Sequence, residues 1–119
     1  MLYYDHIRSK VALMLLRSIT LTAAFMLSIS TPAFSERGVV VHSKSGCDYY
    51  IVETSSGYAL LEWYGGNDPN EGQIIVGPIH SYGMKELYNV SSDRETKAYI
   101  DDYMLSKSSV IEKYYDHCD

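Results

Sequence analysis

The residues of this sequence best suited to chemistry are two cysteines with acidic and histidine neighbours. Cys47 precedes Asp48, and Cys118 lies within the segment DHCD, residues 116–119. Asp, His and Cys are common zinc ligands, so a metal site made from both segments is one interpretation. Structural zinc sites usually carry closely spaced ligand pairs such as C-x-x-C, and the sequence has none. In a short chain with an export signal, two cysteines favour a disulfide between Cys47 and Cys118, and we expect no metal and no cofactor.

A pair of carboxylates acting in hydrolysis is a second candidate chemistry. Glu62 lies in the segment LEWY, while Asp101 and Asp102 are adjacent in KAYIDDYML. Adjacent residues of a strand point to opposite faces, so Asp101 and Asp102 cannot work as a pair, and a hydrolase would need Glu62 with a distant carboxylate. The sequence has no G-x-S-x-G, H-E-x-x-H or phosphate-loop motif. We therefore expect binding rather than catalysis.

Acidic and aromatic side chains together are the third candidate, a recognition surface. Residues 36–119 carry fourteen Asp and Glu against seven Lys and Arg, a net charge of −7. Nucleic acid and anionic lipid bind through Lys and Arg, so this charge disfavours both and fits a basic protein or cell-wall component better. The same residues include ten tyrosines and Trp63, ring types that are enriched at interfaces. We predict a partner-binding rim around Tyr58, Tyr64 and Asp68, although tyrosines also serve small cores with their hydroxyls turned to water.

The first 35 residues have the layout of a secretory signal peptide. Basic residues come early, residues 18–28 form an uncharged apolar run, and Pro32 is followed by small side chains. We predict cleavage after Ser35, which leaves Glu36 first, with a cut after Ala33 as the alternative. Membrane contact would then be limited to the signal peptide before cleavage.

An uncleaved membrane anchor is the other interpretation of the leader. Residues 11–28 approach the ~20 residues that span a bilayer. Arg17 lies inside this run, and a central arginine is costly to insert, so we favour cleavage. The predicted organisation is a signal peptide at 1–35 and one small domain at 36–119, located in the periplasm or secreted.

The predicted domain is mainly β with a short C-terminal helix. Short runs rich in β-branched and aromatic residues alternate with glycine-containing turns, which is typical of a small barrel or roll of five or six strands. The runs that we expect to be strands are residues 38–44, 47–54, 58–64, 73–77, 84–90 and 97–105. The segment at 65–72 is dense in turn formers, and we interpret it as a loop rather than a calcium site.

Alternation predicts which side chains of two strands face the core. In residues 58–64 we expect Leu61 and Trp63 to point inward, with Glu62 marking the opposite, wetter face. In residues 97–105 we expect one face to carry Ala98, Ile100, Asp102 and Met104 and the other Tyr99, Asp101 and Tyr103.

The C-terminal tail changes to a helical period. Its apolar stripe consists of Val110, Ile111, Tyr114 and Tyr115. Ser109 and Glu112 have the spacing of a capping box, which would begin the helix near Ser109. Cys118, just past the helix, would then fasten it to the sheet beside Cys47.

Several short motifs occur in order along residues 47–118. They are Cys-Asp-Tyr, Gly-Tyr, Leu-Glu-Trp-Tyr-Gly-Gly, the glycine-flanked isoleucine segment at 72–77, and a closing Tyr-x-x-Cys. In this order the chain resembles a group of small exported bacterial β-rich proteins. The resemblance implies a compact SH3-like barrel and transfers no functional residue, and Gln73 stands where the group suggests an acidic residue.

These features predict an exported, non-catalytic binding module with an acidic, tyrosine-rich surface. An inhibitor of a cationic cell-wall-active enzyme is one concrete version. A small secreted hydrolase that uses Glu62 is the alternative, and a structural envelope protein is the simplest role. The sequence does not indicate an oligomeric state.

Overall fold

The structure, a computed structural model, describes residues 35–119. It contains the strands β1 (Glu36–Ser43), β2 (Tyr49–Thr54), β3 (Gly57–Gly66), β4 (Ile74–Gly77), β5 (Gly83–Asn89) and β6 (Arg94–Leu105), followed by the helix α2 (Lys107–His117). The predicted mainly β fold with a short C-terminal helix is confirmed. All of the predicted leader except Ser35 lies outside the described residues. Within residues 35–119, no helix is long and apolar enough to span a membrane.

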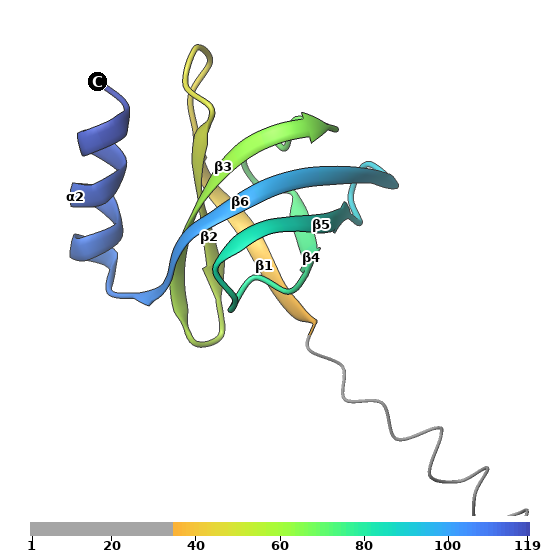
Figure 1. The fold of residues 1–119 in the computed structure, drawn as a ribbon, viewed down its shortest axis with the longest axis horizontal. Coiled ribbons are helices and arrows are strands. Elements are labelled where there is room, and N and C mark those ends of the chain that lie inside the picture. The colour runs from red at the N-terminus through yellow and green to blue at the C-terminus, as the bar shows by residue number, and fades with distance from the viewer. Residues whose placement is uncertain (1–34) are drawn as a thin grey trace, which may run out of the picture. The chain divides into compact units, whose positions relative to one another are not determined.

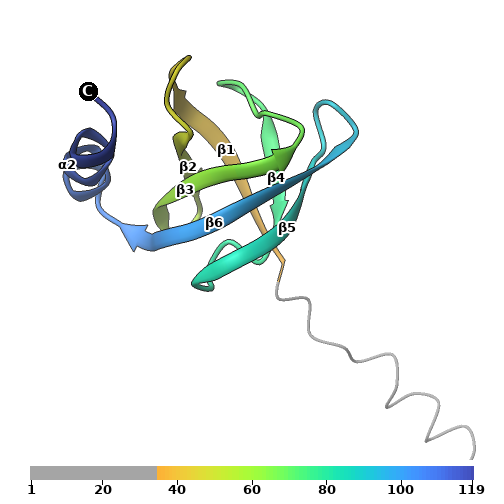
Figure 2. The ribbon, with the colours of Figure 1, turned by 45° about the horizontal axis from the view of Figure 1, so that its top comes forward.

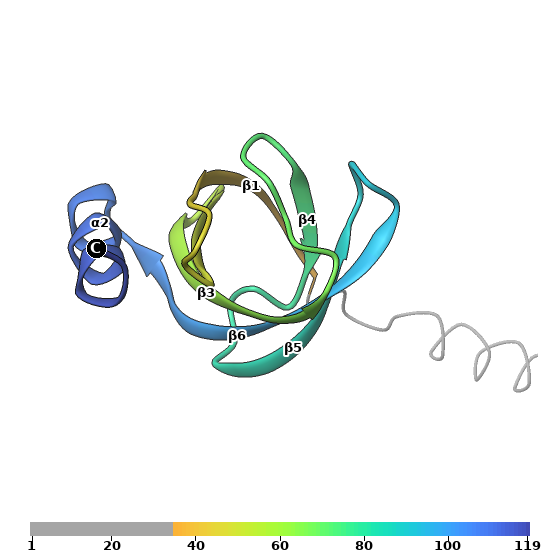
Figure 3. The same ribbon diagram turned by 90° about the horizontal axis from the view of Figure 1, so that it is seen from above.

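The six strands form a closed antiparallel barrel in the order β1-β2-β3-β6-β5-β4, with β4 paired back to β1 (Figure 1). Strands β1 to β3 and strands β4 to β6 are two successive meanders, joined by the loop at residues 67–73. Seen from above, the strands make a ring, and α2 lies outside it (Figure 3). The helix is therefore an addition to the barrel wall rather than a plug of its interior.

The barrel interior is filled by side chains that alternate along the strands. Its buried members are Val40, Tyr50, Val52, Ala59, Leu61, Ile75, Ile79, Leu87, Ala98 and Ile100. Trp63 is half-buried against this core, as its predicted inward direction requires. Its Nε1 donates to the main-chain oxygen of Asn67 at 3.0 Å. The indole thus closes one end of the core and also holds the loop that follows β3.

The loop at residues 67–73 is fixed by hydrogen bonds centred on Asn67. The Thr96 hydroxyl donates to the Asn67 main-chain oxygen at 2.6 Å, and the Asn89 side chain donates to the Asn67 side chain at 2.7 Å. The Asn89 amide also donates to Gln73 at 2.9 Å. Because Asn89 and Thr96 are fully buried, these bonds satisfy polar groups that would otherwise be costly to bury. The predicted loop at residues 65–72 is confirmed from residue 67 on, whereas Gly65 and Gly66 still belong to β3.

A second, smaller core lies on the outer face of the barrel, under α2. Ile51 of β2 and Leu60 of β3 point outward and are covered by Val110, Tyr114 and Cys118. Figure 2 shows the helix beside β2 and β3. The outer face of β3, which we expected to be wet, is therefore dry at Leu60, because the helix shields it from water.

The regular alternation of β6 ends after Ile100. Its pairing with β3 shifts register between Leu60 and Leu61, where Ile100 and Asp102 are the partners. As a result Tyr103 packs against the barrel core, whereas Met104 has φ +55° and is 60% exposed. The prediction that Met104 shares the face of Ile100 is wrong, because the irregularity reverses which side chains face inward.

The helix begins two residues after Leu105, earlier than predicted. Ser106 is its N-cap, with extended backbone, and its hydroxyl accepts from the Ser109 amide at 3.2 Å. The predicted capping box starting at Ser109 is therefore wrong, since Ser109 lies inside the first turn. Ser106 satisfies an amide that would have no partner within the helix.

A polar cluster on the surface ties α2 to β6. Lys113 of the helix lies 3.1 Å from the Asp102 carboxylate, which also accepts from the Tyr103 amide at 2.9 Å and the Tyr82 hydroxyl at 3.2 Å. Burial raises the pKa of Asp102, but these hydrogen bonds and the Lys113 charge outweigh it, so the pKa lies below its usual value. Asp102 is thus a structural carboxylate that is held in its charged form.

Candidate functional site

An open groove lies between α2 and the barrel wall, over the outer faces of β1 and β2. The helix packs on β2 and β3, while β1 presents outward-facing valines that stay exposed, Val39 at 39% and Val41 at 38%. The groove has a volume of about 380 Å³, within the range of roughly 300–1,000 Å³ that is typical of ligand sites. It exists because α2 is placed to cover Leu60 and leaves the β1 side of the sheet open.

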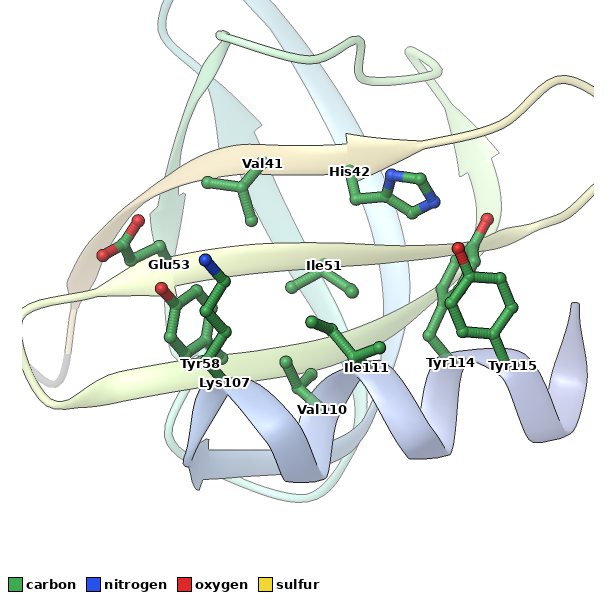
Figure 4. A pocket seen from close by; sticks show the side chains of 10 residues that line it. All are labelled: Val41, His42, Ile51, Glu53, Tyr58, Lys107, Val110, Ile111, Tyr114 and Tyr115. Atoms are coloured by element: carbon green, nitrogen blue, oxygen red, sulfur yellow. The ribbon is translucent and has the colours of Figure 1, made fainter.

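The groove has an apolar floor and two polar ends (Figure 4). The floor is made by Ile51 of β2 and by Val110 and Ile111 of α2, facing Val41 of β1. One end, the charged end, is formed by Lys107, Glu53 and Tyr58. The other, the aromatic end, is formed by His42, Tyr114 and Tyr115. An apolar floor with a few polar groups at its ends is the usual composition of a binding site for a partly apolar ligand.

The aromatic end of the groove is a fixed cluster of rings. The ring of His42 meets the ring of Tyr114 edge-on, with centroids 4.6 Å apart, and Tyr114 meets Tyr115 in the same way at 5.3 Å. His42 Nδ1 lies 3.6 Å from the Glu71 carboxylate. The Tyr114 hydroxyl is buried without a hydrogen-bond partner among residues 35–119, and burial raises its pKa. A bound group that donates to or accepts from this hydroxyl would gain a full hydrogen bond.

The disulfide predicted between Cys47 and Cys118 is present, with the two Cα atoms 5.9 Å apart. Both sulfurs are therefore unavailable to a metal ion, and the ring of His117 stacks on Tyr49 with centroids 4.1 Å apart. Across residues 35–119, no group of three or more His, Cys, Asp and Glu side chains could hold a metal. The metal interpretation of Asp116, His117 and Cys118 thus loses its thiolate ligand. A disulfide fits an oxidising, exported compartment.

The structure places the predicted rim residues in three different surroundings. Tyr58 is half-buried at the charged end of the groove. Tyr64 is 53% exposed on the same face of β3, next to Tyr99 with ring centroids 6.5 Å apart. The two tyrosines are six positions apart along the strand, roughly 20 Å. Asp68 is exposed in the loop at the mouth of the barrel, so the three do not share one pocket.

Comparisons with known proteins assign this chain to no family. No protein-family model, curated protein or solved structure matches this chain. The function must therefore follow from the geometry and charge of residues 35–119.

The carboxylate considered for hydrolysis, Glu62, lies on an open strand surface. It is half-buried opposite Tyr49 on β2 and lines none of the three pockets described for residues 35–119. The pKa of Tyr49 is raised to about 12, mainly by burial and then by the hydrogen bond to Glu62 and the negative charge of Glu62. Glu62 thus interacts with the hydroxyls of Tyr49 and Tyr64.

Sequence reasoning identified Tyr58 but missed most of the groove. Val41 and His42 come from β1, Glu53 from β2 and Lys107 from α2, and no spacing in the sequence connects these three elements. One signal was present: the run Val39-Val40-Val41 must turn at least one valine outward if it is a strand, and such a valine can form part of an apolar contact surface.

Proposed function

We propose that this chain is an exported, non-catalytic binding module for a basic protein, and that the groove receives an apolar side chain of that partner. The observation that supports this most is the groove itself, which keeps Val41 and Ile111 partly exposed above a buried Ile51. Covering these side chains would remove apolar surface from water, worth about 1.5–3 kcal/mol for one inserted Leu- or Phe-sized side chain.

The charge of the domain favours a basic partner. Fourteen acidic residues against seven basic ones produce a negative field that speeds the approach of a cationic protein. Glu71 beside His42 contributes to this field at one end of the groove, whereas Glu53 at the other end lies with Lys107. Charge then brings the partner to the surface, and the apolar floor retains it.

A cationic enzyme that degrades the cell wall is the concrete partner that we propose. Such enzymes act in the periplasm or outside the cell, where the Cys47–Cys118 disulfide is stable. An inhibitor needs no catalytic residues of its own, in keeping with the absence of catalytic motifs from the sequence.

The test is calorimetric binding of the oxidised protein to a set of basic wall-degrading enzymes, with an acidic protein of similar size as the negative control. The decisive variant is Ile111→Asp, which puts a charge on the groove floor at a partly exposed position. We expect it to weaken binding at least tenfold, since it removes apolar burial and buries a carboxylate in the complex.

Ser108→Asp is the matched control, because it adds the same charge to an exposed position of the same helix outside the groove lining. It should leave the affinity unchanged. Equal effects of both variants on the affinity would mean that the groove floor has no special role in binding. Failure of every basic enzyme to bind would reject the proposed partner.

A further inference from the structure

A second pocket lies at the mouth of the barrel, between two loops. The loop from β1 to β2 contributes residues 44–48, and the loop from β3 to β4 contributes residues 68–70. The cavity has a volume of about 310 Å³, and its lining is mostly polar. The β3–β4 side is held rigid by the hydrogen bonds of Asn67, so the pocket is formed before any ligand arrives.

The pocket ends on a buried hydroxyl that no protein group satisfies. Tyr50 is 2% exposed, with its ring in the barrel core, and no residue among 35–119 hydrogen-bonds its hydroxyl. Tyr50 lines the pocket together with Asp68. Burial and then the charge of Asp68 raise the pKa of Tyr50, which keeps its hydroxyl protonated. Buried hydroxyls are normally paired, so this one marks a position where a polar group of a ligand would be stabilised.

Two carboxylates of the pocket have no cationic partner. Asp48 and Asp68 are exposed, and neither forms an ion pair with another residue of the described domain. Lys44 also lines the pocket, but its Nζ donates to the main-chain oxygen of Asp119 at 2.8 Å, which directs its charge toward the end of α2. The pocket thus joins uncompensated negative charge to a free hydroxyl.

We propose that this pocket binds the guanidinium or ammonium group of a side chain of the basic partner, held by Asp68 and the Tyr50 hydroxyl. Such a group brings several N–H donors and no acceptor, and a carboxylate with a hydroxyl provides the matching acceptors. A calcium ion would need about six to eight oxygen ligands, more than two exposed carboxylates readily supply. The inference rests on the basic partner proposed above but uses a site separate from the groove.

The test is an NMR titration of the isotope-labelled, oxidised protein with arginine amide. Both ligands carry an acetylated α-amino group, and citrulline amide is the control ligand because its urea side chain has nearly the shape of the guanidinium without its charge. We expect arginine amide to shift the amide signals of residues 44–48 and 68–70 in a saturable way, and citrulline amide to leave them in place. Tyr50→Phe keeps the ring and removes the hydroxyl, and it should weaken arginine amide about tenfold. Asp68→Asn should remove saturable binding.

Asp93→Asn is the matched charge control, since Asp93 lies in the β5–β6 turn outside the pocket lining. Equal shifts with citrulline amide, unchanged affinity in both Tyr50→Phe and Asp68→Asn, or stronger saturable shifts with calcium chloride would each overturn the proposal. Ile111→Asp separates this result from the proposed function: it should weaken partner binding in the groove at least tenfold yet leave the arginine amide titration unchanged. If arginine amide binds but no basic protein does, the pocket remains supported as a site for a cationic group and the proposed protein partner is rejected.

Discussion

Removal of the disulfide is expected to cost this domain a large share of its stability. The cysteines are 71 positions apart, and closing a loop of that length removes roughly 4.4 kcal/mol of chain entropy from the unfolded state at 25 °C. Domains of this size have a free energy of unfolding of roughly 4–13 kcal/mol. The double substitution Cys47→Ala with Cys118→Ala should therefore lower the free energy of unfolding by about 4 kcal/mol, roughly a third or more of the total.

The assay is urea unfolding of the parent and the double variant, followed by Trp63 fluorescence for the barrel and by far-ultraviolet circular dichroism for both barrel and helix. Hydrogen exchange adds the local view, because Cys118 directly follows α2 and lies in the outer core. We expect the α2 amides to lose more protection than those of β3. A loss below about 1 kcal/mol, in a parent whose disulfide is shown to be formed, would refute the reasoning that the long loop stabilises the fold.

Three further perturbations test the packing and the charges. Val110→Ala should lower the free energy of unfolding by about 2 kcal/mol in urea titrations, because it removes two buried methyl groups from the outer core. Asp102→Asn should make the free energy of unfolding depend less on pH in the acid range. The pKa of Asp102 is lowered in the folded state, so its contribution to stability is present above the unfolded value of about 4 and is lost as the pH falls below that value toward the folded pKa. Tyr49 has its pKa raised to about 12, so its contribution is complete below the unfolded value of about 10 and is lost as the pH rises through 12. Tyrosinate absorbance of the folded protein should accordingly lag behind that of the denatured protein in this range, and less so in Tyr49→Phe.

Local patterns in the sequence predicted the strands, the helix and the disulfide. The hairpin of β2 and β3 follows from two alternating runs around Gly57, which pairs with Thr54 and has φ +126°. A β-carbon on this glycine would lie 2.8 Å from the Leu105 oxygen, so the residue also allows β6 to approach closely. Such short-range requirements are met by particular residue types, so sequence analysis can detect them.

Features that depend on contacts between distant elements could not be predicted. Leu60 is dry because α2, some fifty residues later, lies over it, and alternation along β3 cannot reveal that cover. Met104 faces outward because a register shift against β3 reverses the phase of β6, and nothing in the segment IDDYML indicates it. The groove depends on where α2 lies on the outer face of the barrel, because this position leaves the β1 side uncovered. The free hydroxyl of Tyr50 likewise requires knowledge of every neighbour of its ring.

The pairing of β4 with β1 limits how this domain can recognise another chain. Open sheets often capture a peptide as an added strand, through main-chain amides and carbonyls along an unpaired edge. In residues 35–119 each strand already has two strand neighbours, so no strand of the barrel leaves a whole edge open. Specificity must then come from side chains, and substitutions on the surface, rather than changes of backbone register, are the means by which a new partner could be acquired.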